Sequence, residues 1–155
     1  MTTVLAAVRA DSLNFPLFVH VLGATILVGG IVTGASALAF AKGEARLLRL
    51  GYWSLLALSL PGYVIMRVGA QWIYSKEGWD DLPDDFNYPS WLDIGFVVAD
   101  AGAIVLLLAL VLGGVGVYRL RQGKGTGFLK ATLVLSLVLL AAYVVAVWAM
   151  AGKPG

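Results

Sequence analysis

The chain has 155 residues, of which 60% are hydrophobic and only 13% are charged. Its mean hydropathy of +0.88 corresponds to far more apolar surface than one small water-soluble core can bury, so the composition excludes an ordinary soluble domain and indicates an integral membrane protein. The net charge of +2 comes from charges that are sorted by loop, so it predicts no nucleic-acid partner. Since the chain has no cysteine, disulfides, thiolate metal sites and cysteine-ligated iron–sulfur clusters are also excluded.

Four apolar runs are long enough to cross a bilayer, which takes about 20 residues of α-helix. The fold class is therefore predicted to be all-α, a single membrane domain in which four transmembrane helices form an up-and-down bundle. The expected helices are residues 15–40, 47–74, 91–118 and 128–150. The first run is too long for the core of a signal peptide, so we expect it to stay in the protein as the first helix, after a short lead-in.

The charges in the connections predict which side of the membrane each connection faces. Basic residues gather in residues 41–46 and 119–127, whereas the connection at residues 75–90 is acidic. By the positive-inside rule the two basic connections face the cytoplasm, and the acidic connection and both termini lie outside. Tryptophan and tyrosine residues near the outer helix ends fit an interfacial aromatic belt. We therefore expect a multi-pass protein of the plasma membrane whose first partner is the lipid bilayer.

The second helix carries two features that are unusual inside a membrane. Pro61 and Gly62 predict a kink in mid-membrane, because proline removes one backbone hydrogen bond and clashes with the preceding turn. Beyond the kink lies Arg67, followed at i+4 by Gln71, so the two share one polar stripe. This half of the helix is the first indication of an intramembrane site.

Each of the four helices carries a polar residue at a similar distance from its outer end. At 1.5 Å per residue, His20 lies about 8 Å deep, Arg67 and Tyr143 about 10 Å, and Asp100 about 13 Å. A charged side chain in hydrocarbon costs at least about 2.5–3.5 kcal/mol, so such residues usually face the bundle interior and pair. We predict an Arg67–Asp100 ion pair within an inward-facing polar layer.

His20 is the only histidine of the chain, and three roles are open to it. It is either a packing residue that donates to Asp100 or to a backbone carbonyl, or a haem or metal ligand, or a proton-transfer group. Small residues that allow close helix packing in lipid share its helix face, namely Gly23, Gly30 and Gly34. We therefore expect His20 to pack against a neighbouring helix. The Arg67–Asp100 pair is likewise either a structural lock or part of a ligand or proton site.

Two other motifs predict no site. The acidic run DDLPDD lacks the spacing of a calcium loop, and it is most simply a solvated outer connection. The glycines at 113, 114 and 116 follow no strand, so they do not form a nucleotide-binding loop.

The first helix carries the pattern FVHVLGATILVGG, an apolar segment with one histidine, a Leu-Gly-Ala step and a later Val-Gly-Gly. This pattern resembles the first helix of small bacterial membrane proteins around the copper-resistance D (CopD-like) group, of related uncharacterised integral membrane families, and of the HemJ-type protoporphyrinogen oxidases. The resemblance to the HemJ-type enzymes implies haem ligation at the position of His20. Met66, Met150, an open position or His20 of a second copy would then complete the iron coordination.

Three functions stay open at this point. In the first, the outer polar layer binds a small ligand, with haem as the sharpest candidate; His20 would be the axial ligand, Arg67 a propionate partner, and Asp100, Gln71 and Tyr143 further members of the site. The second is a small transport or proton-relay component that oligomerises. The third is an accessory structural subunit of a larger membrane complex. No catalytic triad or metal-ligand cluster is recognisable, so no enzymatic activity is assigned.

Overall fold

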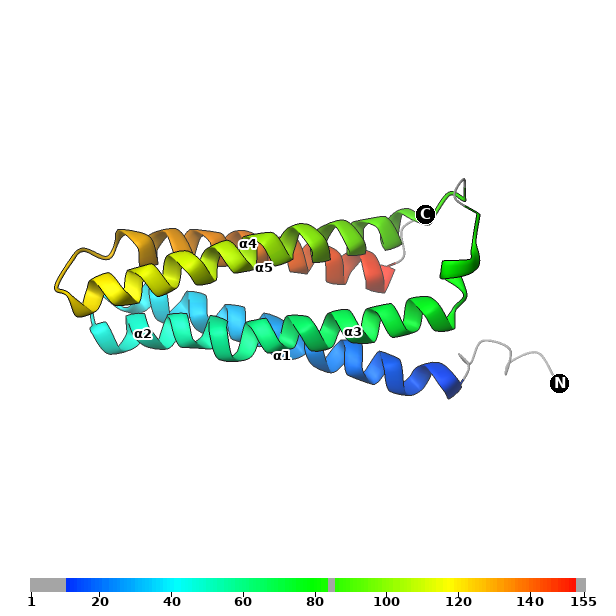
Figure 1. Cartoon of the computed structure of the whole chain (residues 1–155), viewed down its shortest axis with the longest axis horizontal. Coiled ribbons are helices and arrows are strands. Elements are labelled where there is room, and N and C mark those ends of the chain that lie inside the picture. Colours follow the sequence, from blue (N-terminus) through cyan, green and yellow to red (C-terminus); the bar gives the residue numbers. More distant parts are fainter. Residues whose placement is uncertain (1–10, 84–85, 153–155) are drawn as a thin grey trace.

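The computed structural model describes residues 11–83 and 86–152, and within these ranges the chain folds into helices without any strand (Figure 1). The helices are α1 (Asn14–Phe40), α2 (Ala45–Ser54), the π-helical turn η3 (Leu55–Ser59), α3 (Leu60–Lys76), α4 (Ser90–Arg121) and α5 (Gly127–Gly152), with short 3-10 turns η2 (Asp11–Leu13) and η4 (Trp79–Asp81). α2, η3 and α3 form one continuous span, so four spans are long and apolar enough to cross a membrane. The prediction of an all-α four-helix bundle is confirmed.

Several helix ends extend beyond the predicted bounds. The second span starts at Ala45 instead of 47, α4 ends at Arg121 instead of 118, and α5 ends at Gly152 instead of 150. These added turns carry small residues and arginines, and the long arginine side chains can reach the membrane surface. The turns are therefore helical without being strongly apolar. The first ten residues of the predicted lead-in lie outside the described residues, as do two aspartates of the acidic connection.

A π-helical turn, η3, lies just before Pro61, the residue at which the sequence predicts a kink. Leu60 donates its backbone N–H to the carbonyl of Leu55, five residues back, which is the π-helical pattern. Pro61 has no N–H, so the wide turn lies where the α-helical ladder loses a bond in any case. The helix continues through this point, and Ala45–Lys76 is a single span of 32 residues.

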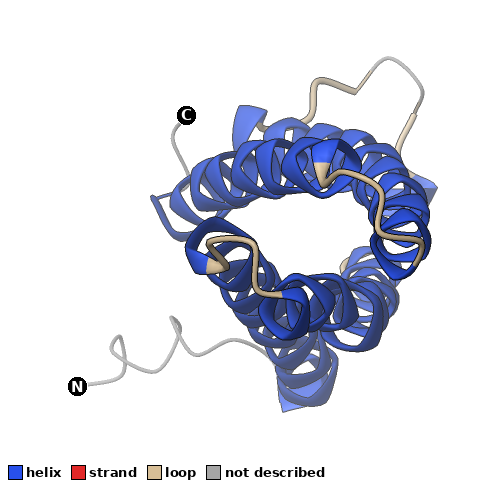
Figure 2. Cartoon of the chain, turned by 90° about the vertical axis from the view of Figure 1, so that its left-hand side faces the viewer, coloured by secondary structure: helices blue, strands red, loops and turns tan. Residues whose placement is uncertain are grey.

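The four spans pair as two hairpins that lie against each other (Figures 1 and 2). α1 packs mainly on α3, with further contacts to α2 and η3, and α4 packs mainly on α5. α5 also contacts α1, and α2 contacts α4, so the spans form the ring seen end-on in Figure 2. α3 and α4 meet along only a short stretch. The bundle is therefore tight within each hairpin and loosest between α3 and α4.

Glycines bring α1 against the second span almost backbone to backbone. A Cβ atom built on Gly23 would collide with the backbone N of Met66 and lie 2.6 Å from its Cα. A Cβ atom on Gly62 would lie 2.5 Å from the backbone N of Leu27. Gly30 lies two helical turns after Gly23, and a Cβ atom built on it would lie 2.8 Å from the backbone N of Ser59 in the second span. The predicted close packing of the glycine face of α1 is confirmed.

Apolar side chains fill the bundle and also cover its outside. Leu27, Ile31, Leu55, Leu106 and Leu139 are buried at its centre and come from all four spans. Large apolar residues on every span are exposed on the outer faces. This arrangement is consistent with contact between the bundle and lipid.

The two basic connections lie at one end of the bundle, and the acidic connection lies at the opposite end (Figure 1). Their observed extents are residues 41–44 and 122–126 for the basic connections and 77–89 for the acidic one. Which end faces the cytoplasm stays a prediction from the charge pattern.

Candidate functional site

Arg67 and Asp100 form an ion pair between α3 and α4. The Nη2 atom of Arg67 lies 2.9 Å from Oδ1 of Asp100, and the predicted pair is confirmed. The guanidinium also lies over the ring of Phe96, with Cζ 5.1 Å from the ring centroid. Phe96 lies one helical turn before Asp100 on α4, so the ring and the carboxylate hold the same guanidinium.

The ion pair lies at the lateral surface of the bundle. The side chain of Asp100 is 63% exposed and that of Arg67 is 32% exposed. The residues just before them, Met66 and Ala99, are buried in the core. Because successive helical residues point about 100° apart, the core-facing sides of α3 and α4 leave the pair at the outer edge of the contact between the two helices. The expectation that the pair faces the bundle interior is therefore wrong.

The polar stripe on α3 continues from Arg67 toward the acidic connection. Gln71 is exposed one turn further on. The hydroxyl of Tyr74 donates to the hydroxyl of Tyr88 at 3.2 Å, and its ring meets the edge of Phe96 with centroids 5.4 Å apart. We call the surface formed by Arg67, Gln71, Tyr74, Phe96 and Asp100 the α3–α4 seam.

His20 lies on another side of α3 from the ion pair. Its Nδ1 atom is 3.0 Å from the carbonyl oxygen of Met66. A Cβ atom on Gly69 would lie 2.7 Å from the Cα of His20, so the α1 and α3 backbones nearly touch here. Two packing partners were predicted for His20, Asp100 or a backbone carbonyl. In the structure His20 contacts the backbone carbonyl, and Asp100 pairs with Arg67 instead. Because a carbonyl only accepts hydrogen bonds, this contact requires the proton on Nδ1, and in a neutral imidazole the lone pair is then on Nε2.

Tyr143 is in the core. Its side chain is only 4% exposed, and its hydroxyl is buried without a hydrogen-bond partner in the described part of the chain. It points toward Gly102 of α4, where a built Cβ would lie 2.8 Å from the hydroxyl oxygen. The absence of a side chain at Gly102 therefore makes room for the tyrosine hydroxyl. Tyr143 faces inward as expected, but it does so away from the surface that carries the ion pair.

The five residues expected to form one site thus occupy three places. Arg67, Asp100 and Gln71 lie on the α3–α4 seam, His20 lies at the α1–α3 contact, and Tyr143 lies in the core. No group of three or more histidine, aspartate or glutamate side chains that could hold a metal occurs among residues 11–83 and 86–152. The seam is the only one of the three places with opposite charges in contact.

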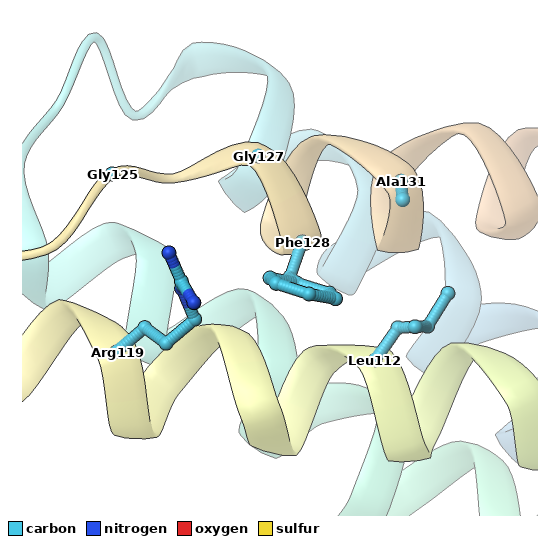
Figure 3. Close-up of a pocket in the computed structure, with 6 residues that line it drawn as sticks. All are labelled: Leu112, Arg119, Gly125, Gly127, Phe128 and Ala131. Atoms are coloured by element: carbon cyan, nitrogen blue, oxygen red, sulfur yellow. The ribbon is translucent and has the colours of Figure 1, made fainter.

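A pocket that the sequence analysis missed lies between α4 and α5, at the end with the basic connections (Figure 3). Its volume is about 350 Å³, and its lining residues are Leu112, Arg119, Gly125, Gly127, Phe128 and Ala131. The guanidinium Cζ of Arg119 lies 5.3 Å from the ring centroid of Phe128. The signal in the sequence was an arginine at the end of one apolar run and a phenylalanine at the start of the next, joined by a glycine-rich turn.

No protein-family model, curated protein or solved structure matches this chain. The likeness of its first helix to CopD-like and HemJ-type proteins stays a prediction.

Proposed function

We propose that the protein is a small transport or proton-relay component that works as a homodimer, with its polar site formed where the α3–α4 seams of two copies meet. The observation that carries this proposal is the lateral exposure of Asp100, which is 63% within a membrane-spanning helix. Ionisable residues inside spans usually pair and mark ion or proton pathways. A carboxylate turned toward hydrocarbon is unfavourable by about 2.5 kcal/mol or more, so a polar partner should cover the seam.

A second copy of this chain is the partner that fits the seam best. Arg67 and Asp100 lie side by side on antiparallel spans, so they are at one depth in the membrane. A two-fold axis parallel to the helices would place each arginine opposite the aspartate of the other copy. Every charge then has two partners of opposite sign, which offsets more of the free energy of removing it from water than a single partner does.

Asp100 is the member of the pair that can exchange a proton. Arginine keeps its proton throughout the physiological range, so only the carboxylate can change charge. A neutral Asp100 would lose its attraction to Arg67, while Phe96 would still hold the guanidinium through its ring. The pair can therefore open and close without the arginine leaving the seam. Since the core of one bundle is filled mainly with apolar side chains, the seam is the better place for a polar pathway.

Proton flux into liposomes that contain the purified protein tests this function. We expect an imposed pH gradient to drive flux through the wild type and not through Asp100→Asn, which keeps the shape of the side chain but cannot ionise. Asp93→Asn is the matched control, because Asp93 is also exposed and lies two turns earlier on the same face of α4. Absence of flux in the wild type, or equal loss in both variants, would contradict the relay function.

Cysteine cross-linking tests the dimer separately, and the chain has no native cysteine to interfere. Gln71→Cys on the seam should give an oxidised dimer in membranes, whereas Val144→Cys, exposed on the outer face of α5, should stay monomeric. A cross-link from Gln71→Cys to a different protein would replace the dimer with the accessory-subunit function. Equal cross-linking of the two variants would show that the seam is not an interface.

Haem binding through His20 is a second candidate, favoured by the bond between Nδ1 and the Met66 carbonyl. Metal-bound histidines usually donate their other ring N–H to such an acceptor, so His20 fits the role of axial ligand. Arg67 does not fit the role of propionate partner, because it pairs with Asp100 on another face of α3. Bound haem would supply one-electron redox chemistry.

The visible spectrum of the purified protein, recorded with and without added haem, tests this candidate. A Soret band that His20→Ala abolishes would support ligation. The matched control is Asn14→Ala, at the start of the same helix, where the side-chain amide donates to Oδ1 of Asp11. A spectrum that haem does not change would remove the candidate while leaving the flux and cross-linking experiments unaffected.

A further inference from the structure

We propose that the pocket between α4 and α5 binds the phosphate of an anionic phospholipid, with the headgroup at Arg119 and an acyl chain along Leu112 and Ala131. This proposal is independent of the α3–α4 seam. In Figure 3, Arg119 and Phe128 project into the same space from α4 and α5, and Leu112 lies further along α4. Leu112 is seven residues from Arg119, about 10 Å closer to the middle of the membrane. The pocket is thus charged at the membrane surface and apolar toward the bilayer centre, as a phospholipid is.

Arg119 is a cation that still needs an anionic partner. Its Nε atom is buried and has no hydrogen-bond partner in the described part of the chain. No aspartate or glutamate follows Asp100 in the sequence. The nearby charges at the end of α4, on the following connection and on α5 are all positive, namely Arg121, Lys124 and Lys130. A guanidinium presents parallel N–H donors that match two oxygens of a phosphate, so a phosphate suits this position better than a single water does.

The start of α5 adds a second source of positive potential to the pocket. α5 begins at Gly127 and is 26 residues long, so its first backbone N–H groups lack helical acceptors and carry the positive end of the helix dipole. Gly125 and Gly127 line the pocket, and a Cβ atom built on either would meet nothing within 4 Å. An anion can therefore approach the backbone here without a side chain in the way.

The one acidic residue at this end of the bundle in the described part of the chain, Glu44, lies on the other basic connection. Glu44 is the N-cap of α2 at the same end of the bundle, and Lys42, Arg46 and Arg49 lie on its connection and first two turns. The end of the bundle therefore has a large excess of positive charge even when Glu44 is counted. Basic pockets between membrane helices at a positively charged face are typical binding sites for anionic lipid headgroups.

Thermal unfolding of the full chain in detergent tests the proposal, with phosphatidylglycerol, phosphatidylcholine and inorganic phosphate as separate additives. We expect phosphatidylglycerol to raise the unfolding temperature of the wild type most. Arg119→Gln should raise the half-saturating concentration of phosphatidylglycerol about tenfold or more, because it removes a charge-assisted hydrogen bond. Arg121→Gln is the matched control, since Arg121 is exposed and does not line the pocket.

Leu112→Trp provides a second variant that keeps Arg119 and fills the apolar part of the pocket. We expect it to weaken the stabilisation by phosphatidylglycerol and to leave any stabilisation by inorganic phosphate unchanged. Equal responses of Arg119→Gln and Arg121→Gln would overturn the proposal in favour of general attraction to the basic connection. Stabilisation by inorganic phosphate as strong as by phosphatidylglycerol would assign the site to a free anion, and an equal effect of phosphatidylcholine would overturn the anionic preference.

Discussion

The contact between α1 and the second span is where one added methyl group should change stability most. In Gly23→Ala the new Cβ would collide with the backbone N of Met66 and lie 2.6 Å from its Cα. Ordinary van der Waals contact for a Cβ atom begins near 3.4 Å, so the helices would have to separate by about 1 Å. A backbone atom cannot rotate away as a side chain can, so the separation would spread along the interface and loosen the His20–Met66 hydrogen bond.

Gly29→Ala, on the same helix, isolates this packing effect. A Cβ atom built on Gly29 meets nothing within 4 Å. Both substitutions bring the same gain in helix propensity, about 1 kcal/mol, so it cancels in their difference. Inserting a methyl group into a well-packed interior costs typically about 1–3 kcal/mol. We therefore expect Gly23→Ala to be less stable than Gly29→Ala by about 1–3 kcal/mol.

Unfolding in mixed micelles with a rising fraction of SDS, followed by tryptophan fluorescence, measures this difference. Gly29→Ala should unfold at or above the wild-type SDS fraction, and Gly23→Ala clearly below it. Gly62→Ala approaches the same interface from the second span and should behave like Gly23→Ala, since its Cβ would lie 2.5 Å from the backbone N of Leu27. Equal stability of Gly23→Ala and Gly29→Ala would refute the close approach of the two helices.

Three further predictions concern the polar residues and the topology. Arg67→Leu should destabilise the protein less together with Asp100→Leu than alone, because an unpaired charge in the membrane is costlier than none; additive losses in the SDS titration would argue against the pair. Tyr143→Phe should leave stability unchanged or raise it by up to about 1 kcal/mol, because it removes a buried hydroxyl that has no partner in the described residues; a loss of similar size would reveal a bound water. Asn87→Cys should react with a membrane-impermeant maleimide on intact cells and Gln122→Cys only after lysis, and the opposite pattern would invert the topology.

The four spans could be predicted because the bilayer sets a minimum length for an apolar helix. The helix ends could not, because hydropathy detects the part of a helix in hydrocarbon and misses the turns in the headgroup region. The second span shows this: its first turn, from Ala45, includes Arg46 and is helical although it begins before the predicted bound at residue 47. The kink expected at Pro61 stays a prediction, and the π-helical turn just before this proline could not be predicted from the sequence.

The ion pair could be predicted from the depth and charge of its two residues, whereas the side of the bundle that it faces could not. Periodicity shows which residues share a face of one helix, but the neighbour that the face meets depends on how the helices pair. The close approach of α1 at Gly23 and Gly62 turns the Met66 side of α3 toward α1. Arg67, the next residue, is then left at the side of α3 that reaches α4 and the surface.

Position along α4 distinguishes the partners proposed for the α3–α4 seam and for the pocket at Arg119. Asp100 lies ten residues, about 15 Å, from the start of α4, which is deep for a headgroup contact, so the proposed dimer would cover it with another protein surface. Arg119 lies two residues, about 3 Å, from the other end of the same helix, within reach of headgroup phosphates. In the two proposals above, one helix thus carries one polar region for a protein partner and one for lipid. Because the two proposed partners would bind far apart along α4, Arg119→Gln should leave Gln71→Cys cross-linking unchanged. A parallel loss of lipid response and cross-linking would show that lipid binding and dimer formation are coupled.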